Sequence, residues 1–175
     1  DFLTKNGFIV CGNDHMGHKN SSKTEDKLGH FENKNAHLSL SADIHKLQNI
    51  VSERYPDIPY FMFGHSMGSF IVRDCLARFD DKIHGAIICG TSGGSVLTPS
   101  AIIIARTIAY IKGGEYKSRL IDKLAFGKYN SSYTDVKTDF DWLSRDEEEV
   151  KKYIADPYCG RMFSANSFAN LFSLL

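Results

Sequence analysis

Apolar residues fill three short segments without interruption, at residues 8–11, 60–63 and 86–89. Continuous apolar runs of this length are typical of strands that are buried on both faces, whereas strands with one solvent face alternate apolar and polar residues. Such strands belong to a parallel sheet. The pattern therefore predicts three parallel strands in the first half of the chain.

Two helices are predicted between these strands. Apolar residues recur at helical spacing from Ile44 to Val51, and Pro56 ends the pattern because proline cannot continue a helix. The segment 69–79 has the same periodicity. The resulting order of strand, helix, strand, helix and strand predicts a doubly wound α/β layout with right-handed crossovers.

The pattern changes after residues 90–94, because no further strand-like run follows and the remainder predicts helices separated by polar loops. A helix from Thr98 or Ser100 to Ile111 is expected, followed by a short one over 116–126. Ser144 and Glu147 have the spacing of a capping box, which predicts a third helix that ends near residue 156. We expect residues 1–97 to form part of an α/β core and residues 98–175 to form a helical cap.

The pentapeptide Gly64-His65-Ser66-Met67-Gly68 lies between a predicted strand and a predicted helix. This is the setting of a nucleophile elbow, in which a tight turn exposes a serine hydroxyl. We expect Ser66 to be the nucleophile, Met67 to offer its backbone N–H to an oxyanion at the positive end of the helix, and Gly64 and Gly68 to stand where side chains would collide. His65 is expected to pack behind the turn. The alternative is a structural serine, since such pentapeptides also occur by chance.

The histidines leave no base for a triad in the order serine, acid, histidine. None follows His84 in the sequence, and His84 itself is expected on the surface, at the end of the sheet opposite the strands' carboxyl ends. The chain also lacks an initiator methionine and stops in mid pattern. We therefore expect both ends to be cut, the triad aspartate and histidine to lie outside the chain, and residues 1–175 alone to be inactive.

His15 and His18 lie three residues apart in a polar loop after the first predicted strand. Two histidines suggest a metal site, but no second cluster offers matching ligands, and Gly17 is also what a rigid, hydrogen-bonded turn needs. A structural loop is favoured over a metal site. No metal and no cofactor are predicted.

Composition indicates which partners are disfavoured and in which cellular compartment the protein works. With 175 residues the chain is within the size of one domain, and its net charge of zero with scattered lysines and arginines argues against nucleic acid. Four cysteines without paired spacing indicate a reduced, cytoplasmic protein. The longest apolar segment, residues 101–111, is shorter than the roughly 20 residues of a membrane span and contains Arg106.

Three motifs together resemble one family. Residues 14–21, 64–68 and 140–146 are similar to those of the monoacylglycerol lipase and lysophospholipase-like branch of the α/β-hydrolases, the serine aminopeptidase S33 type. In that family the first motif carries arginine and glycine where this chain has Met16 and Lys19. The resemblance implies an incomplete α/β-hydrolase fold, with a His-Gly oxyanion loop upstream and a triad aspartate and histidine downstream that have no counterpart here.

The family resemblance implies a serine hydrolase of carboxylic esters, with a monoacylglycerol or a lysophospholipid as substrate and an acyl-enzyme on Ser66. A proline iminopeptidase-like peptidase or an acyltransferase fits the same fold, because fold alone does not decide chemistry. A non-catalytic remnant that binds an apolar ligand is the alternative of another class.

The predicted cap helix is rich in isoleucine, at positions 102, 103, 104, 108 and 111. For any one of these side chains, ordinary packing of the cap against the sheet is favoured. The alternative is that they line an acyl tunnel or make transient contact with a membrane surface.

Overall fold

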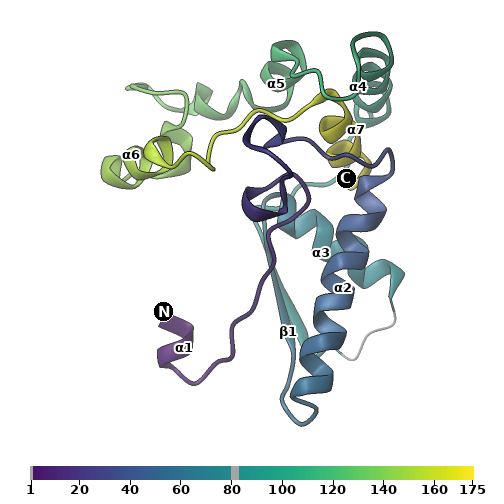
Figure 1. Ribbon diagram of the computed structural model, residues 1–175. Helices are drawn as coiled ribbons and strands as arrows, with labels where there is room; N and C mark the ends of the chain where they lie inside the picture. The colour runs from purple at the N-terminus through teal and green to yellow at the C-terminus, as the bar shows by residue number, and fades with distance from the viewer. Residues whose placement is uncertain (1, 80–82) are drawn as a thin grey trace. The chain divides into compact units, whose positions relative to one another are not determined.

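The computed structural model describes residues 2–79 and 83–175, which fold into two compact units (Figure 1). The first unit holds the residues through His15, then His37–Gly93 and Leu174. The second holds Met16–Ala36, Gly94–Ser173 and Leu175. The division into residues 1–97 and 98–175 stays a prediction. In the structure, residues 16–36 fold with the second unit.

The first unit contains a two-stranded parallel sheet. Strand β1, Phe61–His65, pairs with β2, Gly85–Cys89, in a register that runs from Phe61 opposite Gly85 to His65 opposite Cys89. Helix α3, Met67–Arg78, connects the two strands, and the long helix α2, Ala36–Arg54, precedes β1 and runs alongside it (Figure 1). The second and third predicted strands and both predicted helices are thereby confirmed.

The prediction of a strand at residues 8–11 is wrong. The segment follows a short helix α1, Phe2–Lys5, and pairs with no strand among the residues that the structure describes. Phe8, Ile9 and Val10 are each at least half exposed. A strand is held by hydrogen bonds to a neighbouring strand, and among the described residues this segment forms no such ladder with β1 or β2.

The core of the first unit lies on one face of the sheet. Met62 of β1 is buried with Val72 and Cys75 of α3, and Ile44 of α2 packs against them. The side chains of β1 alternate between exposed and buried, so that Phe63 on the other face is 67% exposed. The expectation of strands buried on both faces is therefore wrong for the described residues, because the helices of this unit cover one face only.

The second unit is helical. Its α-helices are α4, Thr98–Lys112; α5, Arg119–Phe126; α6, Glu147–Ala155; and α7, Ala165–Ser173. Its 3₁₀ helices are η1, Lys19–Ser21; η2, Glu25–Lys27; η3, Tyr129–Ser132; and η4, Asp141–Leu143. The three predicted helices after residue 97 are confirmed as α4, α5 and α6, and α4 packs on α7.

The predicted capping box at Ser144 and Glu147 is wrong. Asp146 is the N-cap of α6, and its carboxylate accepts a hydrogen bond from the Glu148 N–H at 3.0 Å. The Ser144 hydroxyl accepts instead from the Asp146 N–H at 3.0 Å. An aspartate caps at least as well as a serine and also carries a charge that favours the helix N-terminus, so it takes the capping position.

Candidate active site

Ser66 lies between β1 and α3 in a backbone conformation that residues other than glycine rarely adopt, with φ 53° and ψ −123°. Its N–H donates to the Cys89 carbonyl at 3.0 Å, and its carbonyl accepts from the Ser69 N–H at 2.9 Å and the Ser69 hydroxyl at 2.6 Å. Such strain persists only where the surroundings fix the backbone, and it is concentrated at functional sites. The side chain is exposed, as an attacking hydroxyl must be.

The two glycines of the pentapeptide differ in their surroundings. A Cβ atom at Gly64 would lie 2.5 Å from the Gly68 carbonyl oxygen and 2.8 Å from the Ser69 Cα, so the close approach of strand and helix requires glycine there. A Cβ at Gly68 would meet no atom of the described residues within 4 Å. The collision expected at Gly68 is absent from this part of the structure.

His65 packs against the turn that follows β2. A Cβ at Gly90 would lie 3.1 Å from the His65 Nε2 atom, and Gly90 has a φ of +58°, so both the space and the backbone conformation favour glycine. The sequence analysis missed Cys89, Gly90 and Ser69 as supports of the turn. The glycine directly after the third apolar run was the available signal.

Met67 is the first residue of α3. The N–H groups of a helix's first turn have no partner within the helix, and the helix dipole places partial positive charge there. The Met67 N–H therefore lies next to Ser66 in sequence and can donate to negative charge that develops on a substrate oxygen.

The family model described as Serine aminopeptidase, S33, matches residues 1–175. The chain belongs to this family. Among solved structures, the S33-family chain is similar to a highly thermostable carboxyl esterase from Bacillus coagulans, solved in complex with glycerol. The TM-score is 0.81 and the sequence identity is 30%, over 92% of the chain and 52% of the esterase. The fold is thus an α/β-hydrolase fold in part.

Two relatives carry lipase names. The monoglyceride lipase of Rattus norvegicus is 25% identical to the S33-family chain over 157 residues, which are 89% of the chain and 44% of the lipase. The monoacylglycerol lipase of Mycolicibacterium smegmatis is 27% identical over 155 residues, 86% of the chain and 46% of the lipase. The chain spans about half the length of the relatives it matches.

Two histidines of the first unit of this S33-family chain contact groups other than Ser66. His45 stacks on Phe79 with ring centroids 3.9 Å apart, and His84 is exposed and accepts from the Tyr60 N–H at 3.1 Å. Within the described residues, the Ser66 hydroxyl has no hydrogen-bond partner. The structure therefore brings the predicted nucleophile and its supports together, and within the described residues it shows no base hydrogen-bonded to the serine.

Asp141 of the 140–146 motif holds a local turn. The Asp141 carboxylate accepts hydrogen bonds from the Thr138 hydroxyl, from the Lys137 N–H and, at 3.0 Å, from the Thr138 N–H. These hydrogen bonds lower the pKa of Asp141, and the bond from the Thr138 hydroxyl has the largest effect. Asp141 is thus satisfied within the second unit, and the expectation that the triad aspartate lies outside the chain stays a prediction.

A serine, a histidine and a carboxylate also meet in the second unit of the S33-family chain. His30 Nδ1 lies 2.8 Å from the Ser164 hydroxyl, and His30 Nε2 lies 4.0 Å from Glu115. Burial lowers the pKa of His30, and Glu115 opposes that shift. Ser164 is fully buried, so no ester could reach its hydroxyl. We interpret this cluster as a structural link between the 16–36 segment and α7.

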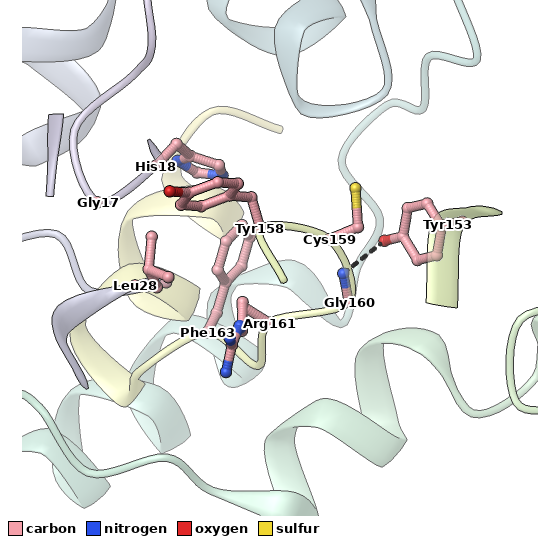
Figure 2. Close-up of a pocket in the computed structure, with 10 residues that line it drawn as sticks. Gly17, His18, Leu28, Tyr153, Tyr158, Cys159, Gly160, Arg161 and Phe163 are labelled. Carbon is pink, nitrogen blue, oxygen red and sulfur yellow. Dashed lines mark hydrogen bonds between the residues drawn. The ribbon is translucent and has the colours of Figure 1, made fainter. Parts of the chain in front are cut away.

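A pocket of about 270 Å³ lies beside that cluster in the second unit (Figure 2). His18 and Tyr158 both line the pocket, and the Gly160 N–H donates to the Tyr153 hydroxyl at 3.0 Å. The remaining lining residues are Gly17, Leu28, Gly29, Cys159, Arg161 and Phe163. His18 Nδ1 lies 3.1 Å from the Met16 carbonyl, and no group of three potential metal ligands occurs among the described residues.

Proposed function

We propose that the complete protein is a serine hydrolase that cleaves carboxylic esters through an acyl-enzyme on Ser66. The observation that carries this proposal is the φ of 53° at an exposed serine between a parallel strand and the first turn of a helix. This geometry is that of a nucleophile elbow. Membership in the S33 family and the named lipases and esterase among its relatives support it.

In the proposed reaction the Ser66 Oγ attacks the ester carbonyl carbon and gives its proton to a histidine base. The Met67 N–H, at the positive end of α3, donates to the oxygen that becomes negatively charged. The bond to the alcohol oxygen then breaks, and the alcohol leaves with the proton held by the histidine. Water attacks the acyl-enzyme in the same way and releases the carboxylic acid.

The base and its aspartate are proposed to come from parts of the protein outside residues 1–175. In the sequence no histidine follows His84, and His45 and His84 of the first unit contact other groups. Residues 1–175 alone are therefore expected to turn over esters no faster than the Ser66→Ala variant of the same segment.

We propose a monoacylglycerol or a lysophospholipid as substrate. Two relatives are named as lipases of monoacylglycerols, and the structural relative was solved with glycerol. Ile103, Tyr110 and Ile111 of α4 are more than 60% exposed, which would suit transient contact of this helix with a lipid surface. No helix of the described residues has the length and apolar character to cross a membrane.

Among the described residues, none of the four cysteines forms a disulfide. This supports the proposal that the protein works in a reducing compartment such as the cytoplasm, since secreted proteins commonly pair their cysteines.

Fluorophosphonate labelling of the complete protein tests the nucleophile. We expect wild type and Ser132→Ala, an exposed serine of η3, to be labelled equally, and Ser66→Ala to be unlabelled with turnover reduced at least about 10³-fold. Labelling of Ser66→Ala at the wild-type rate would sink the proposal. Parallel assays with monooleoylglycerol, lysophosphatidylcholine and a prolyl arylamide separate lipase from peptidase: cleavage of the arylamide alone would favour the peptidase reading that the family description also allows.

A further inference from the structure

Arg73 of α3 holds the loop that follows β2. Its guanidinium Nη1 donates to the Ser92 carbonyl at 2.6 Å and to the Thr91 hydroxyl at 3.3 Å. No carboxylate among the described residues forms an ion pair with Arg73, so its described contacts go to this loop. A hydrogen bond from a charged donor is stronger than one between neutral groups, which makes Arg73 an effective anchor.

The same loop begins at the acceptor that holds Ser66. The Cys89 carbonyl accepts the Ser66 N–H at 3.0 Å, and Gly90 then turns the chain with a φ of +58° directly against the His65 ring. The positions of the Cys89 carbonyl and of Gly90 therefore depend on the course of the loop as far as Ser92.

We propose that Arg73 is a positioning residue for the Ser66 nucleophile. Two hydrogen bonds connect α3 to both ends of the loop 89–92. Arg73 of α3 donates to the Ser92 carbonyl at one end, and the Cys89 carbonyl at the other end accepts from the N–H of Ser66, which directly precedes α3. A strained φ persists only where neighbouring contacts over-determine it. Loss of the Arg73 anchor loosens the loop, and the Ser66 backbone can then relax and move its hydroxyl from the attacking position. The inference rests on the proposed function of Ser66.

The variants Arg73→Gln and Arg73→Lys of the complete protein test this role. Arg78→Gln is the matched control, because Arg78 lies on the same helix and donates from Nε to Asp74 at 2.6 Å, away from the loop. The measurements are kcat and KM on a short-chain ester, the rate of fluorophosphonate labelling, and hydrogen exchange of the Ser66 and Ser92 amides.

For Arg73→Gln we expect kcat and the labelling rate to fall about 10- to 100-fold with KM unchanged, because misplacement of a reacting group by about 1 Å has effects of this size. The Ser66 amide should exchange faster. Arg73→Lys should recover part of the loss, and Arg78→Gln should match wild type in kcat. Equal kcat in Arg73→Gln and Arg78→Gln would overturn the proposal.

The exchange measurement keeps this inference separate from the proposed function. If Ser66→Ala retains full turnover, the nucleophile assignment fails. Unchanged exchange of the Ser66 amide in Arg73→Gln overturns the positioning role whatever the outcome for the nucleophile.

Discussion

Ser66 and Ser164 both directly precede a helix, but their hydroxyls are in opposite environments. Ser164 is buried, and its hydroxyl contacts His30 at 2.8 Å, the Ser167 hydroxyl at 2.9 Å and the Ser167 N–H at 3.2 Å. Ser66 is exposed, and its hydroxyl does not cap α3. The serine whose hydroxyl contacts a histidine is thus the one that cannot meet a substrate.

The backbone explains this difference. A capping serine has extended φ and ψ, so that its oxygen reaches the N–H groups of the first turn, as the Ser164 oxygen does for α7. At Ser66 the φ of 53° excludes that conformation. The Ser66 hydroxyl therefore accepts no hydrogen bond from the first N–H groups of α3. Access and unused donors, more than a histidine nearby, distinguish a nucleophile site from a structural cap.

The largest effect is expected at the glycine that permits the strained turn. Gly64→Ala places a methyl group 2.5 Å from backbone that cannot move alone, so we expect a loss of about 3 kcal/mol in the free energy of unfolding, together with loss of fluorophosphonate labelling. Urea unfolding of the complete protein measures the first, and labelling of Ser66 the second.

Gly68→Ala is the matched control for that variant. Its Cβ meets open space within the described residues, and alanine favours a helix over glycine by about 1 kcal/mol, so stability should be unchanged or raised. Equal losses in the two variants would contradict the explanation of the turn by close approach at Gly64.

The first unit shows what local sequence signals can predict. The apolar runs before Gly64 and Gly90, with a helical periodicity between them, were enough to predict β1, α3 and β2, because each element is specified by its own residues. Residues 8–11 have the same apolar character and form no strand, since pairing depends on a neighbouring segment and not on the residues themselves.

The second unit shows what such signals miss. Ser164 is 134 positions from His30 in the chain, and neither residue belongs to a motif that would link them. Gly17 and Gly29, which both have positive φ, let the 16–36 segment reach Ser164, whose N–H donates to the Gly29 carbonyl at 3.0 Å. The link is a product of tertiary packing, so periodicity and spacing could not predict it.

A smaller effect is expected from Ser164→Ala and Ser167→Ala in the cluster of the second unit. Removal of the Ser164 hydroxyl leaves His30 Nδ1 without its partner, and removal of the Ser167 hydroxyl leaves the buried Phe31 N–H without its acceptor at 2.7 Å. Each should lower the free energy of unfolding by about 2 kcal/mol, as expected for unsatisfied buried polar groups.

The control is Ser173→Ala, in α7 like Ser167. The Ser173 hydroxyl is half-buried and donates to the Ala169 carbonyl, so its removal should change the free energy of unfolding by no more than about 0.5 kcal/mol. If Ser164→Ala instead abolished ester turnover without loss of stability, the roles assigned to the two serines would be reversed.

The smallest effect is the contribution of His30 to the pH dependence of stability. Burial lowers its pKa below 6.5, Glu115 and Glu32 oppose that shift, and Lys27 and Lys117 add to it. Between the folded and unfolded pKa values the unfolded chain binds more protons, so this contribution is fully present above pH 6.5 and decreases as the pH falls below it. Urea midpoints from pH 7.5 to 5 should therefore decline less steeply in His30→Gln than in wild type, because the other titrating groups are common to both. An equal decline in the two proteins would show that burial does not lower the pKa of His30, and a steeper decline in His30→Gln would show that the ion pair with Glu115 raises it instead.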